Sequence, residues 1–102
     1  MDKYKDLEPK VLDWAEERDL LEDNLLGQAN RVLRDTEALH LACRMKSQGR
    51  KEFISGASKI VKTEDEVKST LGKLMFDLII LAEINGVSLE DCLNETYKNK
   101  NK

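Results

Sequence analysis

The sequence has few of the residues that tight turns and sheets require. Its 102 residues include one proline and five glycines, and aromatic side chains make up only 5% of the chain. Sandwiches and barrels usually need more turn formers and more aromatic residues than this. With 40% hydrophobic and 36% charged residues, the composition indicates a soluble, mostly helical protein.

Long apolar runs are also missing. No segment approaches the roughly 18 apolar residues that a membrane span needs, because Lys73 and Asp77 interrupt the best candidate. Residues 1–10 are charged and contain no apolar core, which disfavours a secretory signal. We therefore expect a cytoplasmic protein with no membrane partner, whose two cysteines, Cys43 and Cys92, are reduced thiols packed as small apolar groups.

Strong positive charge is absent as well. The net charge is -3 and the pI is about 5.2, so non-specific attraction to nucleic acid is not expected. The chain contains no phosphate-binding glycine loop, no dinucleotide-binding glycine pattern, no cysteine-rich metal motif and no nucleophile elbow. These absences exclude the commonest sequence-recognisable enzyme classes and a direct nucleic-acid partner.

Apolar residues at helical spacing predict two helices in the first half of the chain. Pro9 suits the first turn of a helix over about residues 7–20. Asp23 or Asn24 can cap a second helix, which continues to about Met45 because apolar residues recur every three or four positions. The segment KSQGRK, residues 46–51, then breaks the pattern.

The second half predicts three more helices. A weaker apolar stripe over residues 53–61 indicates a short third helix. Thr63 and Glu66 have the spacing of a capping box, and the fourth helix that they begin would end at Gly86. Ser88 then caps a last helix that reaches about Tyr97, and we expect residues 98–102, a basic tail, to fray.

The predicted fold class is therefore all-α, a small bundle of four to five helices forming a single domain over residues 1–102. The helix after Thr63 is apolar over a wide arc. A domain of this size often covers such a helix by dimerisation, so we expect a homo-oligomer.

Three segments together carry a family resemblance. They are WAEER (residues 14–18), QANRVLRDTEALHLA (residues 28–42) and LGKLMFDLIILAEINGVSLEDCLNETY (residues 71–97). In order and approximate spacing they resemble the short MazG-like nucleotide pyrophosphohydrolases of the all-α NTP pyrophosphatase superfamily, many of which phages and prophages encode. The segment from Met45 to Thr63 is longer and more basic than the family pattern and aligns with little of it.

The resemblance implies a magnesium site built from carboxylates on two helices. In the family, two adjacent glutamates and a third, three residues after the second, face a Glu and an Asp that lie three residues apart in a Glu-x-Leu-Gly-Asp context. Hard Mg²⁺ ions prefer such oxygen ligands, and the bound metals activate a water for attack between the α and β phosphates.

This chain departs from that pattern at most ligand positions. The apolar register places Arg34, Asp35 and Ala38 at the first three positions, and Thr70 and Lys73 at the last two. Only Asp35 remains acidic, and two positions have become cationic. We therefore predict no catalytic residues and no metal or other cofactor.

The charged residues around these positions leave two interpretations open. Lys73 forms a surface ion pair with Asp77 at i,i+4, or it is a cation that closes the vacated metal site. Arg34 is solvated, or it lines a pocket with Lys73. Candidate residues for binding a phosphate ligand or an acidic partner are Arg34, Lys73, Arg44, Lys46, Arg50 and Lys51.

Three functions follow as hypotheses. The first is a catalytically inactive MazG-like protein that binds another protein as a regulator, in a phage or prophage setting. The second is a metal-free binder of a nucleotide or phosphate ligand. The third is a residual Mg²⁺-dependent pyrophosphohydrolase with relocated ligands.

Overall fold

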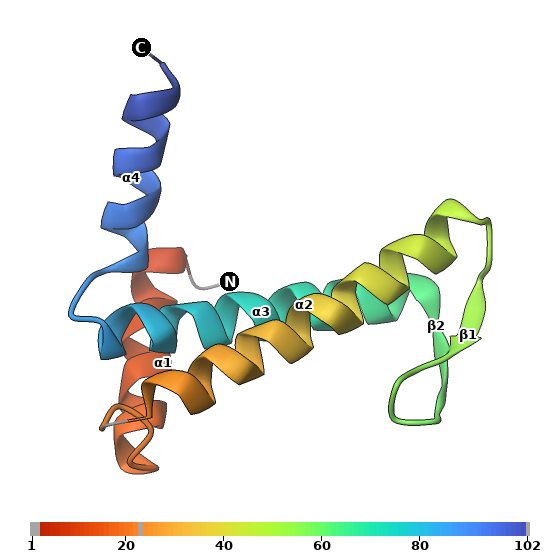
Figure 1. The fold of residues 1–102 in the computed structure, drawn as a ribbon, viewed down its shortest axis with the longest axis horizontal. Helices are drawn as coiled ribbons and strands as arrows, with labels where there is room; N and C mark the ends of the chain where they lie inside the picture. Colours follow the sequence, from red (N-terminus) through yellow and green to blue (C-terminus); the bar gives the residue numbers. More distant parts are fainter. Residues whose placement is uncertain (1–2, 23, 102) are drawn as a thin grey trace. The chain divides into compact units, whose positions relative to one another are not determined.

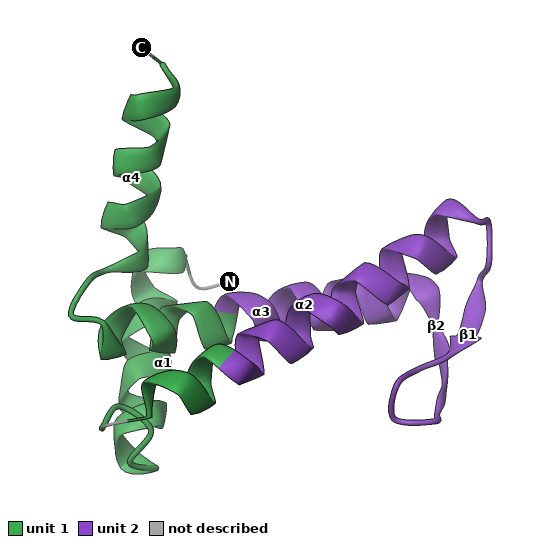
Figure 2. Cartoon of the chain, viewed as in Figure 1, with its two compact units in different colours: residues 1–29, 76–102 green, residues 30–75 purple. Residues whose placement is uncertain are grey.

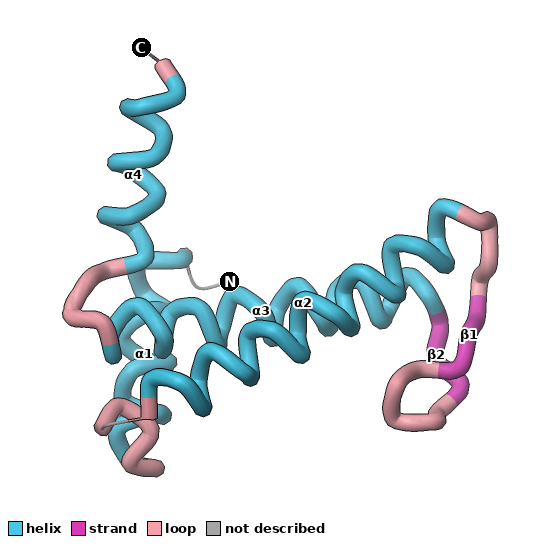
Figure 3. The backbone as a smooth tube through the Cα atoms, viewed as in Figure 1, coloured by secondary structure: helices cyan, strands magenta, loops and turns pink. Residues whose placement is uncertain are grey.

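A computed structural model describes residues 3–22 and 24–101. In these residues the chain forms four helices and one antiparallel two-stranded sheet (Figures 1 and 3). The elements in chain order are α1 (Tyr4–Glu17), α2 (Leu25–Ser47), β1 (Glu52–Ile54), β2 (Ile60–Lys62), α3 (Thr63–Ile84) and α4 (Leu89–Lys100). The prediction of a mostly helical protein is confirmed, and no helix in the described part is long and apolar enough to cross a membrane.

The predicted third helix is wrong. Residues 52–54 and 60–62 are strands, paired antiparallel with Phe53 opposite Val61. Phe53 is buried while its two neighbours in β1 are exposed, which is the alternation of a strand with one covered face. β-Branched and aromatic side chains favour this pleated arrangement over a helix, and Ser58, at φ 61°, supplies the left-handed residue of the connecting turn.

Three helices end in the same way, with a left-handed residue just past the last turn. Gly49 and Gly86 have φ of 73° after α2 and α3, and Asp19 has φ of 55° after α1. After α3, the Val87 N–H donates to the Ala82 carbonyl at 3.0 Å, the six-to-one bond of a Schellman motif. The predicted stop at Gly86 is confirmed, whereas α1 ends at Glu17 and not near residue 20 because Asp19 turns the chain.

The predicted caps have different outcomes. The Ser88 hydroxyl accepts from the Asp91 N–H at 3.3 Å, which confirms the cap of α4. Thr63 is instead the first residue of α3, and its hydroxyl donates to the Arg50 carbonyl at 2.7 Å. Asp23 lies outside the described residues. α4 is helical through Lys100, and the fraying of residues 98–102 stays a prediction.

The chain divides into two compact units (Figure 2). Unit 1 comprises residues 1–29 and 76–102, and unit 2 comprises residues 30–75. The core of unit 1 contains Ala15, Ile79, Ile80 and Ala82, together with the fully buried side chain of Gln28. Its one described ring pair is Trp14 against Phe76, edge to face with centroids 5.0 Å apart.

Unit 2 contains the hairpin formed by β1 and β2 and the parts of α2 and α3 that it connects (Figure 2). Its buried residues are Ala42, Phe53, Thr63 and Thr70. Phe53 therefore anchors the covered face of the hairpin in this core, and the opposite face of the hairpin remains open.

Candidate functional site

The five positions aligned with the metal ligands all lie in unit 2, on α2 and α3. Arg34, Ala38 and Lys73 are exposed, Asp35 is partly buried and Thr70 is buried. Exposure lets both cations keep their hydration, so neither is forced into a pocket. Whether Arg34 and Lys73 close a vacated metal site stays a prediction.

Thr70, which the sequence register aligns with a carboxylate of the family that the chain resembles, has a hydroxyl that is already engaged. It is only 2% exposed, and its Oγ1 donates to the carbonyl of Glu66 at 2.7 Å, one turn earlier on the same helix. A hydroxyl that bonds back to its own helix is satisfied without a ligand. Among the described residues, no group of three or more His, Cys, Asp or Glu side chains could hold a metal ion.

Asp77, which the sequence suggested as a partner for Lys73, has a different contact. The Gln28 side-chain amide donates to the Asp77 backbone carbonyl at 2.9 Å and to its Oδ1 at 3.3 Å. Gln28 is fully buried, so this bond connects α2 to α3 inside unit 1. Sequence reasoning missed Gln28, because an isolated glutamine on an apolar face carries no pattern.

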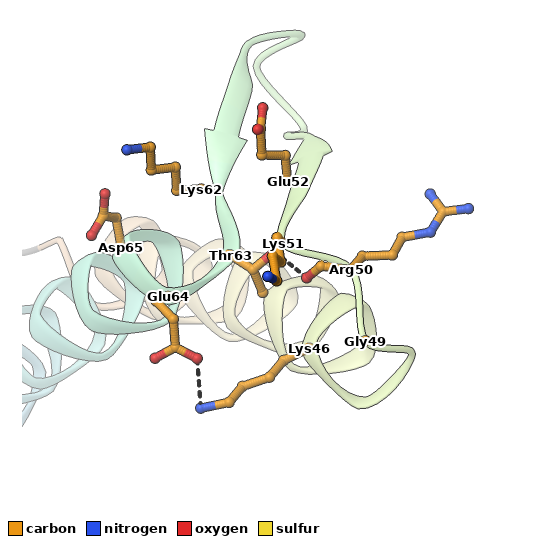
Figure 4. A pocket seen from close by; sticks show the side chains of 9 residues that line it. All are labelled: Lys46, Gly49, Arg50, Lys51, Glu52, Lys62, Thr63, Glu64 and Asp65. Atoms are coloured by element: carbon orange, nitrogen blue, oxygen red, sulfur yellow. Dashed lines mark hydrogen bonds and ion pairs between the residues drawn. The ribbon is translucent and has the colours of Figure 1, made fainter.

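Three of the basic candidates meet at one end of unit 2. A surface pocket of about 540 Å³ is lined by Lys46, Gly49, Arg50, Lys51, Glu52, Lys62, Thr63, Glu64 and Asp65 (Figure 4). Lys46 Nζ lies 3.0 Å from Glu64 Oε1, and the Arg50 side chain extends away from Lys46 (Figure 4). Arg44, also exposed, is not among the lining residues.

The charges in this pocket nearly cancel. Its lining includes four cationic and three anionic side chains, and the Lys46–Glu64 pair is itself more than half exposed at both ends. Exposed ion pairs of this kind contribute little to stability. A strong phosphate site would concentrate positive charge, and this pocket does not.

The open face of the hairpin is the most distinctive surface of unit 2. Ile54 and Ile60 are partners in the strand register, and they are 68% and 75% exposed. Backbone hydrogen bonds between the strands join Thr63 to Lys51 and Ser55 to Lys59. Hydrogen-bonded and non-hydrogen-bonded pairs alternate along an antiparallel sheet, so Ile54 and Ile60 form a non-hydrogen-bonded pair, whose side chains lie close together. Two large apolar side chains thus form one exposed contact surface.

Glu52 and Lys62 complete this open face. They are also register partners, both are exposed, and residues two apart in a strand share a face with their neighbours. The outer face, defined as Glu52, Ile54, Ile60 and Lys62, therefore has an apolar end and a charged end. The β-branched and aromatic residues within 52–54 and 60–62, separated by the turn-forming Gly56-Ala57-Ser58, were the signal that could have found it.

The other side chains that the sequence singled out have no contact, among the described residues, that indicates a catalytic role. Trp14 packs on Phe76 as described above, and Arg18 lies over its ring at 4.2 Å from the centroid. These two contacts make Trp14 a packing residue.

Cys43 and Cys92 are free and exposed, so the expectation that they are packed as apolar groups is wrong.

Tyr4, at the start of α1, has a clearly shifted pKa. Burial raises the pKa of Tyr4 to about 12, and the nearby carboxylates of Glu8 and Glu90 add to the rise. A phenol that stays neutral over so wide a range does not serve as a base at neutral pH.

Comparison with protein-family models, with curated proteins and with solved structures gives no match.

Proposed function

We propose that this protein is a catalytically inactive, MazG-like helical protein that acts as a regulator by binding another protein in the cytoplasm. The resemblance to short MazG-like proteins suggests a phage or prophage setting. Its contact surface is the outer face of the β1–β2 hairpin.

The observation that carries the proposal is the exposed pair Ile54 and Ile60. Adjacent large apolar side chains on a solvent-exposed face mark interaction surfaces in soluble proteins. Both strands are also sheet edges, since the described sheet contains only β1 and β2, and unprotected edges offer backbone groups to a partner. A protein with an apolar patch beside paired charges would match this face.

The substitutions at the metal-ligand positions support the inactive part of the proposal. Four of the five positions carry no carboxylate, and Thr70 binds its own helix. Two positions carry cations. A cation where Mg²⁺ would bind opposes the ion by like-charge repulsion.

The test is a comparison of protein partners captured from the native host by three tagged forms of the full chain. These are the wild type, the variant Ile54→Ser/Ile60→Ser and the control Leu26→Ser. Leu26 matches Ile60 in exposure, at 75%, but it lies on α2 outside the hairpin. The proposal expects a protein retained by the wild type and the control and lost from the hairpin variant.

A binding measurement with that purified protein completes the test. The hairpin variant should lose at least about tenfold in affinity, the loss expected from removing two apolar contacts. Circular dichroism must show that the variant remains folded. Equal affinity of the folded variant and the wild type would exclude the hairpin as the contact surface.

A second candidate function rests on the pocket beside the hairpin. Lys46, Arg50, Lys51 and Lys62 line it, and they could hold a phosphate group without metal. The three acids in the same lining make this binding weak. Calorimetry with inorganic phosphate and a nucleotide panel, with and without Mg²⁺, tests it: heat that disappears in Lys51→Gln would favour a ligand binder, and no heat would exclude one.

A further inference from the structure

α4 has almost no packing within the described chain. None of its residues is buried, every residue from Glu90 to Lys100 is exposed, and within unit 1 it extends away from α1 (Figure 2). It is 12 residues long, and isolated helices below about 12–15 residues are marginal in water. A covering surface would therefore stabilise it.

One side of α4 is apolar. Leu93 and Tyr97 are 66% and 63% exposed, and with Leu89 they follow a spacing of four residues, which keeps them on one side of the helix. Glu90 and Lys100 border the same side, at its two ends, because they lie three residues before Leu93 and three after Tyr97. The α4 stripe is defined here as Leu89, Glu90, Leu93, Tyr97 and Lys100.

The charges of this stripe are self-complementary. In an antiparallel pair of α4 helices, the register that sets Leu93 opposite Tyr97 of a second copy also sets Glu90 opposite Lys100 of that copy. The two-fold axis repeats both contacts, so two apolar pairs and two ion pairs form in one register. Antiparallel helix dipoles favour the same arrangement, whereas a parallel pair would set Glu90 beside Glu90.

We propose that α4 is a self-association helix, whose stripe binds α4 of a second copy of this chain antiparallel with Leu93 against Tyr97 and Glu90 against Lys100. This interface is separate from the hairpin face and does not depend on the proposed function. A 12-residue helix is about 18 Å long, too short to bury the roughly 800 Å² per partner of a standard interface. The dimer is therefore weak and depends on concentration and salt.

Sedimentation equilibrium of the full chain, from low micromolar to millimolar concentration, measures this association. The wild-type average mass should rise from monomer toward dimer with concentration. Glu90→Lys and Lys100→Glu each convert both ion pairs into like-charge pairs, and each variant alone should associate about tenfold more weakly. A wild type that stays monomeric at all concentrations would overturn the proposal.

Mixing the two variants separates pairing from an effect on the helix itself. In the mixed dimer each new lysine faces a glutamate and each new glutamate faces a lysine, so association should return to the wild-type level. If a substitution weakened association by unfolding α4, mixing the two variants would not restore association. Recovery supports the register, and a mixture as weakly associated as the separate variants would overturn it.

Matched controls change the same charges on the outer side of α4. Asp91→Lys and Lys98→Glu lie away from the stripe, so each should associate like the wild type. Ile54→Ser/Ile60→Ser should also leave association unchanged. If the hairpin variant lost self-association and the α4 variants kept it, the second copy would bind the hairpin and the α4 proposal would be wrong.

Discussion

The Gln28 side chain binds Asp77 twice, through the backbone carbonyl at 2.9 Å and through the carboxylate at 3.3 Å. Gln28 is fully buried, so its amide has no access to solvent. This contact holds α2 against α3 in unit 1 through a polar group rather than an apolar one. It also explains why Asp77 is tolerated on the most apolar helix of the chain.

Gln28→Ala should lower the free energy of unfolding by about 2–3 kcal/mol, because it removes a charge-assisted hydrogen bond and leaves a cavity. Urea denaturation followed by circular dichroism measures the change. Gln48→Ala, at an exposed position after α2, should change the same quantity by less than about 0.5 kcal/mol. Equal effects at the two positions would mean that the Gln28–Asp77 contact is not formed.

Asp19→Gly should raise the free energy of unfolding by about 0.5–1 kcal/mol. Asp19 has φ of 55°, a left-handed conformation that glycine adopts without a Cβ clash. Gly86→Asp is the reverse change at the equivalent position after α3, where φ is 73°, and should cost about 1 kcal/mol. Thermal unfolding of both variants tests the pair. A loss of stability in Asp19→Gly, or no loss in Gly86→Asp, would contradict the helix-end geometry.

The stability of the fold should decline at high pH through Tyr4. Its pKa is raised from an ordinary value of 10.0 to about 12 by burial first and by Glu8 and Glu90 second. Between these values the unfolded tyrosine loses its proton while the folded one keeps it, so the folded state binds more protons and the free energy of unfolding falls as pH rises. Below pH 10 the phenol is neutral in both states and contributes no pH dependence.

Tyr4→Phe isolates this contribution from the other groups that titrate at high pH. Denaturant unfolding at several pH values from 9 to 12 should show a steeper decline for the wild type than for the variant. Parallel curves for the two proteins would show that the Tyr4 phenol has no raised pKa.

Introducing the carboxylates of the family that the chain resembles should create metal binding if the proposed register is right. The variant Arg34→Glu/Ala38→Glu/Thr70→Glu/Lys73→Asp keeps Asp35 and supplies the other four acids. Thr70 is buried, so the new carboxylate there is costly without a counter-ion. We therefore expect a less stable protein whose melting temperature rises on addition of Mn²⁺.

The control for this variant retains Lys73 and changes only the other three positions. It should gain less stability from Mn²⁺ than the four-fold variant, because a cation remains at the site. A folded four-fold variant with no Mn²⁺ binding by calorimetry would show that the alignment of Thr70 and Lys73 with the ligand positions is wrong.

The helices could be predicted from the sequence because their signals are local. Apolar spacing located all four, and Ser88 and Gly86 marked the boundary between α3 and α4 correctly. Asp19 was missed because an aspartate in the left-handed region has no distinct sequence signature. The sequence paired Asp77 with Lys73, the nearest cation along the helix. Its actual partner, Gln28, could not be identified, because the burial of Gln28 depends on packing that the sequence does not display.

The hairpin is the main failure of sequence reasoning. Residues 53, 54, 57, 60 and 61 fit a helical stripe about as well as two short strands, and strand segments of three residues are too short for periodicity to decide. The Gly56-Ala57-Ser58 turn favoured the hairpin. Because the proposed contact surface is the outer face of this hairpin, predicting a helix there also missed that surface.

The proposed function depends most on the hypothesis that this chain, despite its resemblance to MazG-like pyrophosphohydrolases, does not hydrolyse nucleotides. A pyrophosphate-release assay over the common NTPs and dNTPs, with Mg²⁺ and with Mn²⁺, measures this directly on the wild-type chain and on Asp35→Ala. We predict no release above the protein-free rate for either protein. Metal-dependent release by the wild type that disappears in Asp35→Ala would contradict the account and identify a working pyrophosphohydrolase.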